Sequence, residues 1–230
     1  MNSSNLICIL KKTSSKKEFK NNFVDLIFKN AKNRGEALLN KYIQIPKEEK
    51  LVVNHAFYSS TKLKALIIPN TITKILYGAF FSCKKLKYLK LGNSIEEIST
   101  SAFSYCALLE YLDLPNSLKI IETGAFAMCI LIKELIIPNN VEEIKQYAFY
   151  NCILLNKLVL SNSIKTIYKS AFEKCIMLQE LDIPNNIDLK EKCFSEIFNI
   201  KKLNISKKYE NKLYDIFTYL DYYNLEINYI

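Results

Sequence analysis

Residues 86–131 contain one pattern twice, as LKYLKLGNSIEEISTSAFSYCAL (86–108) and LEYLDLPNSLKIIETGAFAMCIL (109–131). Each copy starts with leucines at alternate positions, passes through a turn and an apolar-x-x-Ile step, and ends with Ala-Phe-x-x-Cys. Alternation with period two indicates a short strand with one buried face. The Ala-Phe-x-x-Cys spacing indicates a single helical or 3₁₀ turn, with the phenylalanine inside.

The pattern extends well beyond these two copies. Phenylalanines recur every 23 residues, each after an alanine, at Phe57, Phe80, Phe103, Phe126, Phe149 and Phe172. A repeat of this length is typical of a solenoid, in which each unit contacts only its neighbours. Because the strands of successive units stack about 4.8 Å apart, they should form one continuous parallel sheet.

With these motifs the chain resembles the BspA-type leucine-rich-repeat family, whose units look like LxxLxIPxxVxxIxxxAFxxCxxL. The match covers roughly residues 43–205 and recurs at least six times. The resemblance implies a leucine-rich-repeat fold and a binding role, often surface adhesion or host contact, and it implies no particular partner.

We therefore expect an α/β leucine-rich-repeat solenoid, an open arc or rod. Its continuous parallel sheet lies on one face, with short strands and 3₁₀ or helical turns on the other. Open solenoids need caps at both ends. The sequence predicts a helical N-terminal cap over 1–42, the solenoid over 43–205 and a helical C-terminal cap over 206–230. Leu203-x-Ile205 is the expected last strand, and Tyr209, Leu213, Ile216, Phe217 and Leu220 follow one helical face.

Five of the seven cysteines occupy one repeat position: Cys83, Cys106, Cys129, Cys152 and Cys175. A small, buried, apolar residue suits that position, so we expect free structural thiols in the core rather than disulfides or zinc ligands. The one histidine, His55, stands at a variable repeat site. Without a nucleophile, base or metal ligands in a plausible setting, we expect no catalytic residue, no cofactor and no metal site, and hence a non-enzyme.

The residues that flank the middle leucine of each strand should point outward from the sheet. Tyrosines beside apolar and charged residues are common in protein-binding surfaces. We predict that this face binds a protein partner through Tyr88, Lys90, Tyr111, Asp113, Glu134, Ile136, Lys157, Glu180 and Asp182. Ala65, Ile67 and Val159 fall in the same two files.

The net charge of +9 is concentrated at the N-terminus, where residues 1–45 hold nine basic and three acidic residues. An alternative function is therefore binding of nucleic acid or anionic membrane through Lys11, Lys12, Lys16, Lys17 and Lys20. We expect neither nucleic acid nor membrane as the main partner, and we expect a monomer. Without a visible signal peptide or membrane span, the expected location is cytoplasmic or otherwise intracellular, and the alternative is an exported surface adhesin.

Overall fold

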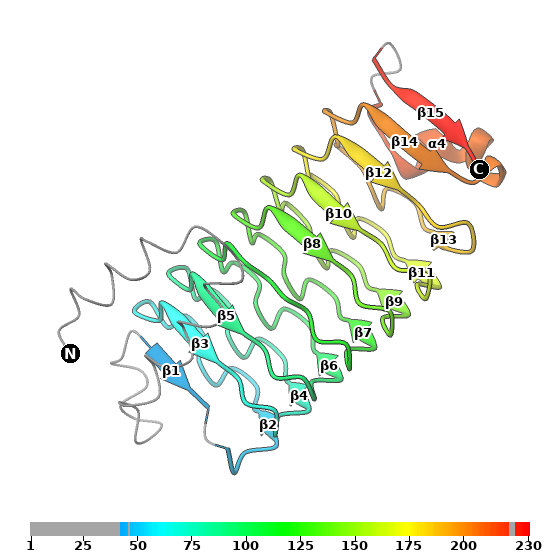
Figure 1. The fold of residues 1–230 in the computed structure, drawn as a ribbon. Coiled ribbons are helices and arrows are strands. Elements are labelled where there is room, and N and C mark those ends of the chain that lie inside the picture. Colours follow the sequence, from blue (N-terminus) through cyan, green and yellow to red (C-terminus); the bar gives the residue numbers. More distant parts are fainter. Residues whose placement is uncertain (1–41, 46, 221–223) are drawn as a thin grey trace, which may run out of the picture.

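The computed structural model describes residues 42–45, 47–220 and 224–230. Figure 1 shows the chain winding as successive coils along one axis, from the coil that contains β1 (Tyr42–Gln44) to the one that contains β15 (Glu226–Tyr229). Residues 1–41 lie outside the described part, and with them the predicted N-terminal helical cap and the five lysines of the nucleic-acid alternative.

The Leu-x-Leu segments form parallel strands on one side of the coil, as the sequence predicts. They are β1 (Tyr42–Gln44), β3 (Ala65–Ile67), β5 (Tyr88–Lys90), β8 (Glu134–Ile136), β10 (Lys157–Val159), β12 (Glu180–Asp182) and β14 (Lys202–Ile205). Their regular pairing falls into three groups, β1-β3-β5, β8-β10 and β12-β14-β15. The coil between β5 and β8 contributes only an isolated parallel bridge between Tyr88 and Tyr111.

The longest regularly paired sheet lies on the other side, where the Ile-x-x-Ile steps form strands of two residues each. Seven of them pair in parallel in sequence order: β2 (Leu51–Val52), β4 (Lys74–Ile75), β6 (Glu97–Ile98), β7 (Ile120–Ile121), β9 (Glu143–Ile144), β11 (Thr166–Ile167) and β13 (Asp188–Leu189). The second residue of each strand is buried and the first points outward. The coil is thus flattened between two layers of parallel strands that enclose one hydrophobic core (Figure 1).

A column of stacked phenylalanine rings runs through this core. Phe80, Phe103, Phe126, Phe149 and Phe172 are fully buried, and neighbouring rings lie 5.1–5.5 Å apart and nearly parallel. Phe57 adds a ring at one end, and Phe194 and Phe217 add two at the other. The ring of Phe217, placed by the sequence prediction on a capping helix, therefore belongs to the core column.

The Ala-Phe-x-x-Cys segments are turns rather than the predicted helical or 3₁₀ turns. The residues two before and two after each column phenylalanine from Phe57 to Phe194 have positive φ, for example Ser101 (56°) and Tyr105 (61°) around Phe103. Left-handed residues interrupt a right-handed helical path. Every second amide bonds to the next coil instead, as Phe103 N does to Ala125 O at 2.8 Å. The amides between them bond to the carbonyl three residues back, as Cys106 N does to Phe103 O at 3.2 Å. The stacking of coils thus overrides local helix formation.

The C-terminal segment is only partly helical, and the predicted helical cap is not confirmed. It contains a 3₁₀ helix, η1 (Lys207–Lys212), and a single α-helical turn, α4 (Leu213–Ile216). Beyond them, β15 (Glu226–Tyr229) pairs in parallel with β14, so Leu203-x-Ile205 is not the last strand. The half-buried Leu225 and Ile227 pack against the core and continue the strand pattern. β15 thus adds one further parallel strand next to β14.

All five ladder cysteines are buried free thiols, as predicted. Each donates its Sγ–H to a phenylalanine carbonyl of the preceding coil, for example Cys83 to Phe57 O at 3.1 Å. Burial raises the pKa of Cys83 and of Cys152 to about 12, and raises that of Cys106 and Cys129 well above the ordinary value. These thiols therefore serve as core packing.

We expect the ladder cysteines to react slowly with maleimide in the native protein. The thiolate is the reactive form, and the raised pKa values keep it scarce even at mildly alkaline pH. Mass spectrometry after a short pulse should find them unmodified in buffer and modified in denaturant. Rapid labelling of Cys106 and Cys129 in the folded chain would contradict their place in the core.

Candidate protein-binding face

The outward positions of the Leu-x-Leu strands form two adjacent files, which we call the sheet face. Strand register places these residues side by side: Ala65, Tyr88 and Tyr111 follow one another in the first file, and Lys157 lies opposite Glu134. The nine predicted partner-binding residues all lie on this face, from Tyr88 to Asp182. The outward positions of the earlier strand β3 differ from these in burial. Ala65 and Ile67 are buried, so among the side chains that the structure describes the accessible part of the face begins at Tyr88.

An exposed apolar pair lies at the middle of the sheet face. Ile136 on β8 and Val159 on β10 are direct neighbours in the parallel register. Their exposed fractions are 51% and 43%, although the leucines beside them in the same strands are buried. Two branched aliphatic side chains side by side in solvent provide an apolar centre that a partner could cover.

Unpaired charges surround this apolar pair. Lys90, Glu134, Lys157 and Glu180 are exposed, and within residues 42–45, 47–220 and 224–230 none of them forms an ion pair. Glu134, Lys157 and Glu180 alternate in sign along one file. Charges that the fold does not pair remain available to a partner, where they contribute to specificity and association rate.

The two tyrosines lie at the N-terminal end of the accessible face, in register with one another. Lys87 lies beside them: its Nζ is 2.9 Å from Glu110 Oε1 and 5.5 Å from the centre of the Tyr88 ring. The hydrogen bond to Glu110 raises the pKa of Lys87, and partial burial raises the pKa of the Tyr88 phenol. Tyr88 therefore stays a neutral phenol at physiological pH, and the ammonium group of Lys87 lies over its ring.

Side-chain hydrogen bonds join three coils at the C-terminal end of the sheet face. Asn204 donates to the carboxylate of Asp182, and Asn228 donates from Nδ2 to Asn204 Oδ1 at 2.9 Å. Asp182 is thus partly satisfied within the fold, unlike Glu180 in the neighbouring file. The side chains with the most unused binding capacity are those of the middle coils.

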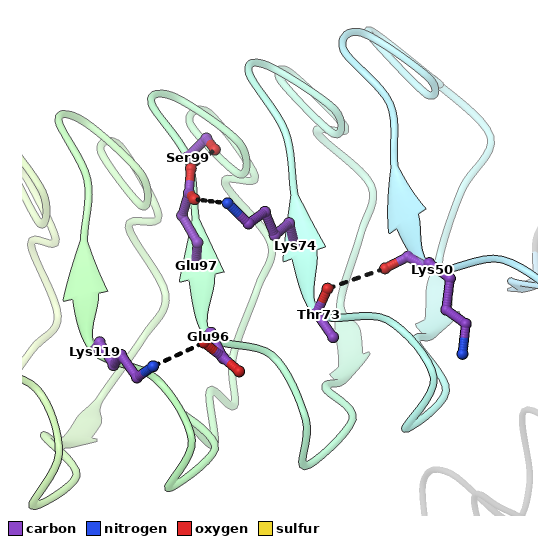
Figure 2. Close-up of polar contacts among 7 residues, drawn as sticks. All are labelled: Lys50, Thr73, Lys74, Glu96, Glu97, Ser99 and Lys119. Carbon is purple, nitrogen blue, oxygen red and sulfur yellow. Dashed lines mark hydrogen bonds and ion pairs between the residues drawn. The ribbon is translucent and has the colours of Figure 1, made fainter.

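The outward residues of the opposite sheet pair with one another instead. Lys119 Nζ lies 2.8 Å from Glu96 Oε2, and Lys74 Nζ lies 3.0 Å from Glu97 Oε2 (Figure 2). The file of Glu96 and Lys119 continues in the next coils with Glu142 and Lys165, whose Oε2 and Nζ atoms lie 2.6 Å apart. Hydrogen bonds from Lys119 and from Ser99 lower the pKa values of Glu96 and Glu97, respectively. Acids and bases alternate from coil to coil and neutralise each other, which distinguishes this sheet from the sheet face.

Metal-binding side chains are not clustered in the described residues. Over that part of the chain, no group of three or more His, Cys, Asp or Glu side chains is placed to hold a metal ion. His55 makes edge-to-face contacts with Tyr58 and Tyr77, with ring centres 5.4 and 5.0 Å away. None of the described helices is long and apolar enough to cross a membrane.

The structure also shows an exposed apolar line that the sequence analysis missed. It runs along the edge of the coil, just before the Leu-x-Leu strands, and includes Leu108, Met177 and Phe198. The signal in the sequence is the dipeptide after each ladder cysteine, which is Lys84-Lys85 in one unit but Ile130-Leu131 and Ile153-Leu154 in later ones.

Comparison with solved structures supports the fold. A leucine-rich-repeat protein of T. pallidum superimposes with a TM-score of 0.68 at 24% identity, over 84% of this chain and 89% of that one. A leucine-rich cell surface protein of Faecalibacterium prausnitzii superimposes with a TM-score of 0.62, also at 24% identity, over 72% of this chain and 48% of that one. No curated protein matches the sequence.

The family model described as the BspA type leucine rich repeat region matches six copies, over residues 36–155 and 96–224. These ranges include most of the chain, and their repeats are those that build the two sheets and the phenylalanine column. The chain belongs to the BspA-type leucine-rich-repeat family.

Proposed function

We propose that this protein is a non-enzymatic interaction module that binds a protein partner through its sheet face. The observation that carries the proposal is the difference between the two sheets. The opposite sheet pairs its own charges, whereas the sheet face exposes Ile136 and Val159 among charges left without ion pairs in the described chain. An apolar centre with a polar surround is the usual anatomy of a protein interface.

A capture experiment with two matched variants tests the proposal. In the first, the charge file of the sheet face is reversed by Glu134→Lys, Lys157→Glu and Glu180→Lys. In the second, the file of the opposite sheet is reversed by Glu96→Lys, Lys119→Glu and Glu142→Lys. All six substituted side chains are exposed, so both variants should fold.

We expect the wild type and the opposite-sheet variant to capture the same protein, and the sheet-face variant to lose it, because like charges across an interface cost several kcal/mol. The proposal fails if the sheet-face variant retains that protein, or if only the opposite-sheet variant loses it. Circular dichroism of all three chains checks that the fold is unchanged.

A second candidate differs in location and keeps the same face. The sequence favours an intracellular chain, whereas family membership and the likeness to a cell surface protein favour an adhesin outside the cell. Protease treatment of intact cells distinguishes the two: a surface adhesin is digested, and an intracellular module is protected.

A further inference from the structure

The edge that leads into the Leu-x-Leu strands carries a line of apolar side chains. The loops before β8, β10 and β12 follow one another along one long edge of the solenoid (Figure 1). In this line the exposed fractions are 42% for Leu108, 36% for Met177 and 51% for Phe198. The isoleucine and leucine side chains at the same place in the intervening coils are half-buried.

Hydrogen bonds between coils hold this apolar edge in line. The amide of Leu154 donates to Ile130 O at 3.1 Å, and Asn199 Nδ2 donates to Ile176 O at 2.7 Å. With about 4.8 Å between coils, the line from Leu108 to Phe198 is about 20 Å long. It lies in the turns that lead into the strands, where its side chains are exposed or half-buried, and we call it the ridge.

Tyrosines flank the ridge. Tyr105 is exposed three residues before Leu108, and the exposed Tyr219 lies beside Phe198, with ring centres 6.2 Å apart. Tyrosine combines an apolar ring with a polar hydroxyl, and such side chains gather where an apolar phase meets water. The ridge thus has an apolar crest, and an amphipathic side chain lies beside it at Phe198.

Lysines occupy the first two coils of the same edge. Lys84 and Lys85 occupy the repeat positions that Ala107 and Leu108 occupy in the next coil, and Lys62 occupies the position of Lys85 in the preceding coil. All three are exposed, and none forms an ion pair with any residue in the described part of the chain. Lys133 and Lys201, next to the ridge, are likewise exposed and without ion pairs there.

We propose that this edge binds the surface of an anionic lipid bilayer. The crest inserts its aliphatic and aromatic side chains at the headgroup level, and the lysines neutralise lipid phosphates or carboxylates. The excess of unpaired lysines argues against a second copy of the chain, which would bring the same positive charge to the contact. The inference is independent of the partner of the sheet face.

Co-sedimentation of the full chain with lipid vesicles tests this inference. The vesicles are phosphatidylcholine alone or phosphatidylcholine mixed with phosphatidylserine, at low and at high salt. One variant removes the crest (Leu108→Ser, Met177→Ser, Phe198→Ser), and another removes the lysines (Lys62→Gln, Lys84→Gln, Lys85→Gln). Matched controls on the opposite side are Leu51→Ser with Val53→Ser, and Lys50→Gln with Lys119→Gln and Lys165→Gln.

The wild type and both controls should bind the mixed vesicles, more weakly as salt rises, and should bind phosphatidylcholine little. The lysine variant should bind at least about tenfold more weakly, and the crest variant should bind more weakly at every salt concentration. No binding of the wild type at low salt overturns the inference. Equal binding by all variants also overturns it, because the lipid contact would then lie elsewhere, for example in the lysine-rich residues 1–41.

Light scattering on the same samples separates a second copy from a membrane. If the wild type is a dimer that the crest variant dissociates, and neither binds vesicles, the ridge is a self-association surface and the inference is wrong. A circular dichroism melt of each variant checks that lost binding does not reflect lost folding.

Discussion

Replacing Phe126 by alanine is expected to lower the free energy of unfolding by about 3–5 kcal/mol. The ring lies between those of Phe103 and Phe149, at centre distances of 5.4 and 5.5 Å, and it is fully buried. The substitution removes the transfer free energy of the ring and leaves a cavity that two rigid neighbouring coils cannot close. Because each coil contacts only its neighbours, the loss in the middle should uncouple the two halves of the solenoid.

Chemical denaturation measures this loss, with Phe198→Ala as the control. Phe198 has the same side chain but is half-exposed at the edge, so its removal should cost less than about 1 kcal/mol. Hydrogen exchange should show the amides of β7 and β9 opening more readily in the Phe126 variant than those near either end. A loss at Phe126 no larger than at Phe198 would mean that the phenylalanine column does not hold the coils together.

The column could be predicted from spacing alone up to Phe172, because a strict 23-residue period leaves each ring only one place in the stack. The C-terminal part was harder to predict. Phe194 follows Phe172 by 22 residues, and Phe217 stands in a segment with a helical apolar pattern. Stacking on the preceding coil outweighed the local pattern, so Phe217 joined the core and the chain continued to β15.

Side-chain pairing could not be predicted from the repeat. The period shows which positions point outward on each sheet, but not which charges meet. The alternation Glu96, Lys119, Glu142, Lys165 was visible in the sequence and forms the ion pairs of the opposite sheet. The alternation of Glu134, Lys157 and Glu180 looks the same in sequence and forms none within the described residues. The difference depends on side-chain rotamers and on the spacing of the coils at each sheet.

The positive φ angles of the turns could not be predicted from the sequence either. Ser101, Tyr147, Ser170 and Lys192 occupy the left-handed site that Gly78 and Gly124 fill in other coils. Two glycines among several larger residues do not by themselves indicate a positive φ. The bonds between coils impose this conformation on any residue that stands there, at a cost of about 1–2 kcal/mol for each non-glycine residue.

The second large effect concerns the partner of the sheet face. Replacing both Tyr88 and Tyr111 by alanine should weaken binding by at least about 2 kcal/mol, roughly thirtyfold. Binding energy concentrates in a few anchor residues, and tyrosine is among the residue types enriched among them. The two residues are in register on neighbouring coils, so one patch of the partner can contact both.

The same double substitution should change the stability of the fold little. Tyr111 is exposed and Tyr88 is half-buried, and the leucines of their strands supply the core contacts. The matched control is Glu142→Ala with Glu143→Ala on the opposite sheet. Glu142 pairs with Lys165 at the surface, where such pairs contribute about 0–1 kcal/mol, and Glu143 pairs with the half-buried Lys145.

The central claim, that the sheet face is the binding surface, is tested most directly by titration calorimetry once a partner has been captured. The dissociation constants of the wild type, the tyrosine variant and the glutamate variant are measured under one condition. We predict a loss of at least about thirtyfold for the tyrosine pair and almost no change for the glutamate pair. Weakened binding by the glutamate variant, with unchanged binding by the tyrosine variant, would place the partner on the opposite sheet and contradict the claim.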